Sequence, residues 1–116
     1  MAAPEQLGGD EMLLALAALA NPHRLRIIAA LTGGTTYVSQ LARDLNISRP
    51  LLHMHLQRLE AAGLVVGHLE MSEDGKAMRY FAVTDFAWQL DASTIATAAE
   101  SLSETTKTAG RTKGNS

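Results

Sequence analysis

Apolar and polar positions between residues 38 and 65 predict two short helices separated by a tight turn. The first helix has apolar residues at i, i+3, i+4 and i+7, namely Val38, Leu41, Ala42 and Leu45. The second repeats leucine at i, i+4 and i+7, namely Leu52, Leu56 and Leu59. Asn46 tolerates the left-handed backbone of a sharp turn, Ser48 is a good N-cap, and Gly63 suits the end of the second helix. This pattern is typical of a helix-turn-helix.

The next segment predicts a two-stranded β-hairpin. Its apolar residues are Val65, Val66, Leu69 and Met71 in the first strand and Met78, Tyr80, Phe81 and Val83 in the second. The polar link of residues 72–76 contains Gly75, which supplies the turn. A helix-turn-helix that runs directly into a hairpin is a winged helix, and its commonest use is to place one helix in the major groove of DNA.

Three more helices are expected around this unit. The first runs from Glu11 to Ala20. The second begins at Asn21-Pro22, a cap followed by a proline at the first helical position, and ends at Gly33-Gly34. Asp91 caps the third, which runs from Ala92 to about Thr105. We therefore expect a mainly α fold of about five helices plus a two-stranded wing.

The composition fits one small domain with a modest core, since 47% of the 116 residues are apolar. We expect this domain at residues 10–105, a flexible N-terminus at 1–9 and a disordered basic tail at 106–116. Phe86, Trp88 and Leu90 alternate before the last helix, which indicates that the second wing strand extends or restarts there.

The second helix of the helix-turn-helix has an outward face that is free to meet a partner. Opposite its leucines lie Pro50, Met54, Gln57, Arg58 and Ala61, flanked by Arg49 and His53. Gln can pair with adenine, Arg with guanine or phosphate, and Leu51 and Met54 can touch thymine methyl groups. In the wing, Lys76 and Arg79 are candidates for phosphate contact. The alternative is that these are ordinary solvated side chains. The candidate DNA contacts are Ser39, Gln40, Ser48, Arg49, Pro50, Leu51, His53, Met54, His55, Gln57, Arg58, Lys76 and Arg79.

The net charge of −2 hides an uneven distribution that matters more than the sum. Residues 21–59 carry five arginines and one aspartate, and residues 76–80 add Lys76 and Arg79. Negative charge dominates the segments on either side. The positive charge is thus expected on the helix-turn-helix and the wing tip. Binding to DNA should then depend strongly on salt, because released counterions supply much of the affinity.

Several classes of protein are disfavoured by the sequence. The absence of cysteine excludes disulfides and thiol sensing. No apolar run is long enough to span a bilayer and the N-terminus lacks a basic signal-peptide start, so we expect a cytoplasmic protein. No nucleophile–base pair, phosphate-binding glycine loop or carboxylate pair stands out, so an enzyme is not expected.

The chain resembles the ArsR/SmtB family of small bacterial winged-helix transcriptional regulators over most of residues 12–84. The resemblance lies in four segments in family order: Leu16 to Ile28, which contains Asn21-Pro22-His23-Arg24-Leu25-Arg26, then Val38-Ser39-Gln40-Leu41-Ala42, Ser48 to Val65 and Gly75-Lys76…Arg79-Tyr80-Phe81. His55 matches a histidine usual in the family, so we assign it to the DNA-binding helix. His53 and Met54 depart from the family pattern, so the operator sequence cannot be taken from any relative.

The resemblance implies a homodimer that binds a short inverted repeat of double-stranded DNA near the promoter of a bacterial operon, usually to repress it. The terminal helices of the family form the dimer interface. The faces that suit this role consist of Leu13, Leu16, Ala17 and Ala20 in the first helix and Ile95, Ala98, Ala99 and Leu102 in the last. The alternative is that these faces pack onto their own domain.

Many members of this family sense metals, but no metal site is predicted here. The last helix has Asp91, Glu100 and Glu104 but no histidine, and carboxylates alone would bind a transition metal weakly. His53 and His55 point about 200° apart around a helix and cannot hold one ion together. No cofactor is therefore expected. Two alternatives stay open: a regulator gated by a metal or a partner protein, and a winged-helix module that binds protein rather than DNA.

Overall fold

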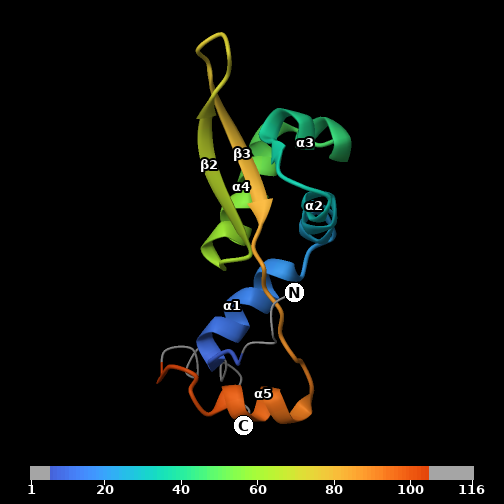
Figure 1. Cartoon of the computed structure of the whole chain (residues 1–116). Coiled ribbons are helices and arrows are strands. Elements are labelled where there is room, and N and C mark those ends of the chain that lie inside the picture. The colour runs from blue at the N-terminus through green and yellow to red at the C-terminus, as the bar shows by residue number, and fades with distance from the viewer. Residues whose placement is uncertain (1–5, 105–116) are drawn as a thin grey trace.

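The computed structural model describes residues 6–104. The expectations for residues 1–5 and 105–116, which include the basic tail, lie outside these described residues. The elements in chain order are α1 (Gly9–Leu19), α2 (Pro22–Thr32), β1 (Thr36–Tyr37), α3 (Val38–Leu45), α4 (Arg49–Ala61), β2 (Val65–Met71), β3 (Ala77–Val83) and α5 (Ala92–Ala99). The helix-turn-helix and wing lie at one end of the molecule and α1 and α5 at the other (Figure 1). The predicted winged-helix fold with five helices is confirmed.

Local chemistry fixes the ends of the central helices. The Asn21 side chain accepts hydrogen bonds from the backbone N–H groups of His23 and Arg24, at 2.8 and 3.3 Å, and Pro22 occupies the first position of α2. Ser48 caps α4 by accepting from the Leu51 backbone N–H at 3.2 Å. Asn46 ends α3 with φ 56° and ψ 47°, the left-handed conformation expected of it.

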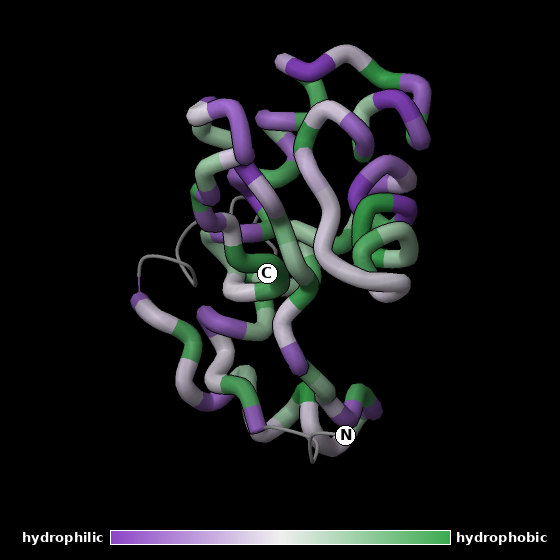
Figure 2. The backbone as a smooth tube through the Cα atoms, turned by 45° about the horizontal axis from the view of Figure 1, so that its top comes forward, coloured by the Kyte–Doolittle hydropathy of each residue, from purple (hydrophilic) through white to green (hydrophobic). Residues whose placement is uncertain are grey.

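The core lies between α2, α3, α4 and the base of the sheet. Its fully buried side chains are Ile27, Leu31, Leu41, Leu52, Leu56, Leu59, Leu64 and Phe81. Hydrophobic and hydrophilic positions alternate along the helices, as amphipathic packing requires (Figure 2). The predicted leucines of α4 are therefore buried in the core, and the opposite face of the helix is exposed to solvent.

The wing belongs to a three-stranded antiparallel sheet with the order β1-β3-β2. The predicted hairpin pairs Val65 with Val83 at its base and Met71 with Ala77 near its tip. The third strand was not expected, because its two residues are too few to show a period. β3 ends at Val83 and only Trp88 forms an isolated bridge after it, so no further strand follows within the described residues.

α1 and α5 pack closely against each other and differ from expectation at their ends. α1 begins at Gly9, two residues early, and α5 ends at Ala99 rather than near Thr105. A Cβ atom at Gly9 would lie 2.3 Å from the carbonyl oxygen of Ala98, so only glycine permits this approach. The Gly9 N–H also donates to the Ser101 hydroxyl at 2.8 Å. Contacts far apart in sequence thus set both boundaries.

Within residues 6–104, no single helix has the length and hydropathy needed to cross a membrane. α1 and α2 would meet these criteria only as a pair, and the chain bends by 92° between them.

Candidate nucleic-acid interface

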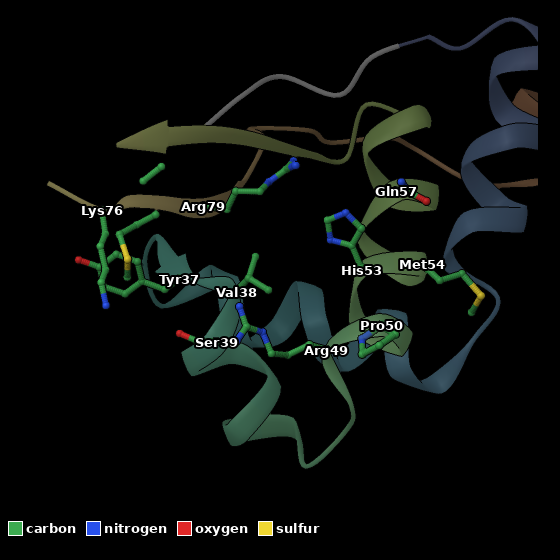
Figure 3. Close-up of a pocket in the computed structure, with 12 residues that line it drawn as sticks. Tyr37, Val38, Ser39, Arg49, Pro50, His53, Met54, Gln57, Lys76 and Arg79 are labelled. Atoms are coloured by element: carbon green, nitrogen blue, oxygen red, sulfur yellow. The ribbon is translucent and has the colours of Figure 1, made fainter. Parts of the chain in front are cut away.

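A groove runs between α4 and the wing, with the start of α3 as its floor (Figure 3). It is lined by Tyr37, Val38, Ser39, Arg49, Pro50, His53, Met54, Gln57, Lys76, Ala77, Met78 and Arg79. Arginine and lysine supply three of these lining residues, and none is acidic. The groove is therefore an electropositive surface on a protein whose net charge is negative.

The walls of the groove bring predicted residues together from distant parts of the chain. His53 points from α4 into the space between helix and wing, and Arg79 extends from β3 toward α4 (Figure 3). The Arg79 guanidinium lies 5.1 Å from the centre of the Phe81 ring, which holds it against the sheet. Arg49, Met54 and Gln57 are exposed on the α4 wall. The predicted face of α4 and the wing thus form opposite walls of one groove.

Five candidate residues lie outside this groove, and one of them, His55, is buried in the core. Ser48 lines the adjoining hollow at the turn of the helix-turn-helix. Gln40 is held within α3, because its amide donates to Asp44 at 2.7 Å and its carbonyl oxygen accepts from Arg43 at 2.7 Å. Arg58 is exposed on α4, one residue beyond Gln57, and Leu51 is half-buried.

His55 was wrongly included among the DNA contacts. It is 3% exposed and faces the core, and its Nδ1 accepts a hydrogen bond from Arg24 Nε at 3.0 Å. Burial lowers the pKa of His55, and the adjacent guanidinium of Arg24 lowers that pKa further. The reason lies in the helical period, since residue 55 falls on the same face as Leu52 and Leu59.

Arg24 is also buried, at 8% exposure, so it adds no positive charge to the surface. Its Nη1 donates to the carbonyl oxygens of Ala17 and Ala18 at 3.3 and 3.2 Å, near the end of α1. The side chain therefore joins α1, α2 and α4 at one point. This role was not predicted from the sequence. The signal that could have indicated it is the position of Arg24 directly after the Asn21-Pro22 helix cap, within a segment that resembles the family.

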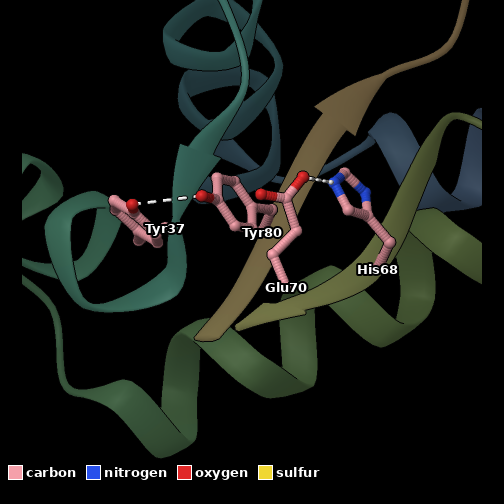
Figure 4. Close-up of polar contacts among 4 residues, drawn as sticks. All are labelled: Tyr37, His68, Glu70 and Tyr80. Carbon is pink, nitrogen blue, oxygen red and sulfur yellow. Dashed lines mark hydrogen bonds and ion pairs between the residues drawn. The ribbon is translucent and has the colours of Figure 1, made fainter. Parts of the chain in front are cut away.

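An aromatic row on the sheet was also missed (Figure 4). The hydroxyl of Tyr80 donates to that of Tyr37 at 3.1 Å, and the His68 ring stacks on Tyr80 with 5.2 Å between centroids. His68 Nε2 lies 3.4 Å from a carboxylate oxygen of Glu70. The hydrogen bond to Tyr37 raises the pKa of Tyr80 above its ordinary value. The contact between Tyr80 and Tyr37 fastens the short strand β1, which borders the groove, to the wing.

The predicted dimer residues divide into two groups. Six of them line a shallow apolar hollow that α1 and α5 form together, namely Leu13, Leu16, Ile95, Ala98, Ala99 and Leu102. We call this the α1–α5 surface. Leu13 and Ile95 are 50% and 47% exposed, whereas Ala98 is only 3% exposed because α1 covers it. Ala98 is thus corrected to a contact within the protomer. Ala17 and Ala20 are exposed outside the hollow.

No group of three His, Cys, Asp or Glu side chains within residues 6–104 is placed to hold a metal ion. His53 and His55 point to opposite sides of α4, as the helical spacing predicted, one into the groove and one into the core. Asp91 caps α5 by accepting from the Thr94 N–H at 2.9 Å, and hydrogen bonds from Gln89 and Thr94 lower the pKa of its carboxyl group.

The sequence is similar to a helix-turn-helix family and to known transcriptional regulators. Residues 19–68 match the family described as "Helix-turn-helix domain". The chain is 35% identical over 74 residues to MJ0229, an uncharacterised HTH-type transcriptional regulator of Methanocaldococcus jannaschii, covering 64% of this chain and 77% of that protein. It is 43% identical over 63 residues to the HTH-type transcriptional regulator CmtR of Mycobacterium tuberculosis. That match covers 54% of this chain and 50% of CmtR.

The fold also matches solved structures. The crystal structure of a possible transcriptional regulatory protein of Mycobacterium bovis (fragment 1–100) aligns with a TM-score of 0.57 and 27% identity, covering 64% of this chain and 74% of the other. A solution structure from the same organism aligns with a TM-score of 0.54 and 20% identity, covering 89% and 82%. It is described as a homodimeric winged helix-turn-helix DNA-binding domain of a possible ArsR-family regulator.

Proposed function

Because the chain belongs to the ArsR family of DNA-binding helix-turn-helix transcriptional regulators, which are not enzymes, we propose that it works as a sequence-specific homodimeric repressor. Each protomer would insert α4 into the major groove of one half of an inverted repeat. A dimer seated on a promoter excludes the transcription machinery, which makes repression the expected sign. The observation that carries this proposal is the groove between α4 and the wing, with basic side chains on both walls and no carboxylate in its lining.

The residues of the groove and of the surface next to it divide by chemistry into reading and positioning roles. Gln57 and Arg58 have the donors and acceptors for base edges, and Met54 is an apolar contact for a thymine methyl group. Arg49, Lys76 and Arg79 would contact phosphates. The other proposed positioning contacts are Ser39, Gln40, Ser48, Pro50, Leu51 and His53. Phosphate contacts fix the register of the protein without reading sequence, so the specificity is assigned to α4.

The α1–α5 surface supports the dimer. It exposes Leu13 and Ile95 in an apolar hollow at the end of the molecule away from the groove. Exposed apolar patches of this kind mark protein–protein contacts. Binding to two half-sites one helical turn apart would require the dimer to hold its two α4 helices roughly 34–36 Å from each other. The homodimeric relative of Mycobacterium bovis is consistent with this arrangement.

The test is selection of bound duplexes from a random pool, followed by anisotropy titrations of the selected duplex at fixed salt. We expect Gln57→Ala and Arg58→Ala each to weaken specific binding by about 1–3 kcal/mol and to relax the selected sequence at one position. The matched control for Arg58→Ala is Arg26→Ala, which removes an exposed arginine of α2 rather than of α4. If both α4 variants bind like the unmodified protein, the reading face is wrongly assigned. If no duplex is selected, the DNA-binding proposal fails.

A further inference from the structure

A second cleft lies at the C-terminal end of α4, beyond the DNA groove. It has a volume of about 430 Å³ and is bounded by α1, by the end of α4 and by the segment that follows β3. Its lining shares no residue with either the groove or the α1–α5 surface. The DNA-binding proposal leaves this cleft without a role.

The charge of the cleft favours a cation. Glu11 and Asp85 line it, and no basic residue does. Glu11 uses one carboxylate oxygen to accept from the Gly8 N–H at 3.0 Å. The Asp85 carboxylate has no hydrogen-bond or ion-pair partner among residues 6–104. The cleft also borders the C-terminal end of α4 at Gly63, where the helix dipole carries partial negative charge.

The remaining lining is apolar and partly aromatic. The rings of Phe86 and Trp88 lie 5.1 Å apart at 31°, and Leu14 of α1 is half-exposed beside the cleft. The face of an indole ring attracts a desolvated cation. An inorganic ion would gain little from these groups, whereas a cation with an apolar body would bury that body against them.

We propose that this cleft binds an amphipathic organic cation, whose charged head lies near Asp85 and whose apolar body packs on Phe86 and Trp88. The site is rigid on one side, because the Thr84 hydroxyl donates to the carbonyl oxygens of Gly63 and Leu64 at 2.8 and 3.1 Å. That pair of bonds ties the segment after β3 to the end of α4.

The position of the cleft makes its occupant an effector of DNA binding. One wall is α1, which also forms the α1–α5 surface, and another is the end of α4, the proposed reading helix. A ligand that favours one spacing of these two helices shifts the relative placement of the two α4 helices in a dimer. This regulatory half rests on the proposed function, whereas binding of the cation does not.

The binding test uses the full chain and benzyltrimethylammonium as the probe. Trp88 is the only tryptophan in the sequence, so its fluorescence reports the cleft directly. We expect a saturable change in emission, and we expect Asp85→Asn to weaken the binding about two- to fivefold through loss of the charge on this exposed side chain. Glu73→Gln is the matched control, because it removes an exposed carboxylate of the wing turn and should change nothing. Benzenesulfonate at the same ionic strength should give no saturable signal.

Three results would overturn the site: no saturable change with the cation, equal affinity in Asp85→Asn, or an equal response to benzenesulfonate. The regulatory half is tested by repeating the DNA titration with saturating cation. We expect at least about a fivefold change in DNA affinity, the lower end of the usual range of allosteric coupling, and Asp85→Asn should need a higher cation concentration to reach the same change. Saturable binding with unchanged DNA affinity would refute the effector role. If the protein bound no duplex at all, the fluorescence result would still decide the site, so the two failures are distinguishable.

Discussion

Replacing Arg24 by methionine should destabilise the protein severely without touching the DNA groove. Arg24 is almost fully buried and donates to His55 Nδ1 and to the carbonyl oxygens of Ala17 and Ala18. Methionine keeps much of the apolar stem but removes the charge and all three bonds. It leaves a buried imidazole nitrogen without its donor, in addition to His55 Nε2, which already has no partner within the described residues.

The size of the effect follows from these bonds. A hydrogen bond from a charged donor contributes about 1.5–3 kcal/mol net, and a buried acceptor left unpaired costs about 1–3 kcal/mol. The two carbonyl contacts are long, at 3.2 and 3.3 Å, so we count mainly the bond to His55. We expect Arg24→Met to lower the free energy of unfolding by about 3 kcal/mol. For a domain of this size that corresponds to a fall in Tm of roughly 12–24 °C.

The assay is thermal and urea denaturation followed by circular dichroism, at one protein concentration because dimerisation contributes to stability. Arg26→Met, an exposed neighbour on α2, is the control and should change the free energy by less than about 0.5 kcal/mol. His55→Leu alone should be costly because it leaves the buried Nε–H of Arg24 without its acceptor. The double variant should recover part of the loss, since two apolar partners need no hydrogen bond. The reasoning is refuted if Arg24→Met behaves like Arg26→Met, or if the two losses simply add.

Three further outcomes follow from the structure. The free energy of unfolding should be highest above about pH 6.5, the ordinary histidine pKa, and should fall as the pH drops toward the lowered pKa of buried His55. Urea midpoints measured across pH 5–8 check this, and His55→Leu should make the midpoint less dependent on pH. Gly9→Ala should push α1 from α5, because the new Cβ would lie 2.3 Å from the Ala98 carbonyl oxygen, and sedimentation equilibrium should show a weaker dimer; an unchanged dimer constant would argue against the α1–α5 surface. Lys76→Ala should reduce the slope of log affinity against log salt by about 0.9 for each phosphate that Lys76 neutralises, and an unchanged slope would remove this wing residue from the DNA contacts.

The parts of the fold that the sequence predicted are those in which one local period decides the structure. The spacing of Leu52, Leu56 and Leu59 specified α4 and its buried side, and Asn46 with Ser48 specified the turn. The hairpin was predicted for the same reason. By contrast, β1 has only two residues and forms because Tyr37 and Tyr80 meet across the sheet. A strand of two residues is too short to show an alternating pattern of apolar and polar residues in the sequence.

The ends of the first and last helices could not be predicted, because they depend on each other. Gly9 looked like part of a loose N-terminus, since glycine is a poor helix former. It is helical here because α5 crosses so close that no side chain fits. The same crossing buries Ala98, which the sequence had placed on the outer face. A pattern of small residues shows that two helices can approach but not which side of each one does so.

His55 shows how a motif and a helical period can disagree over one residue. The motif placed it on the DNA-binding helix, and it does lie there, but the period from Leu52 to Leu59 turns its ring inward. Inside, it accepts from Arg24, whose backbone N–H is itself capped by Asn21. The Asn-Pro cap, the buried arginine and the helix histidine are thus one connected set of hydrogen bonds. That set orients α4 relative to α1 and α2, so residues that never touch the groove determine the angle at which the helix can be presented to DNA.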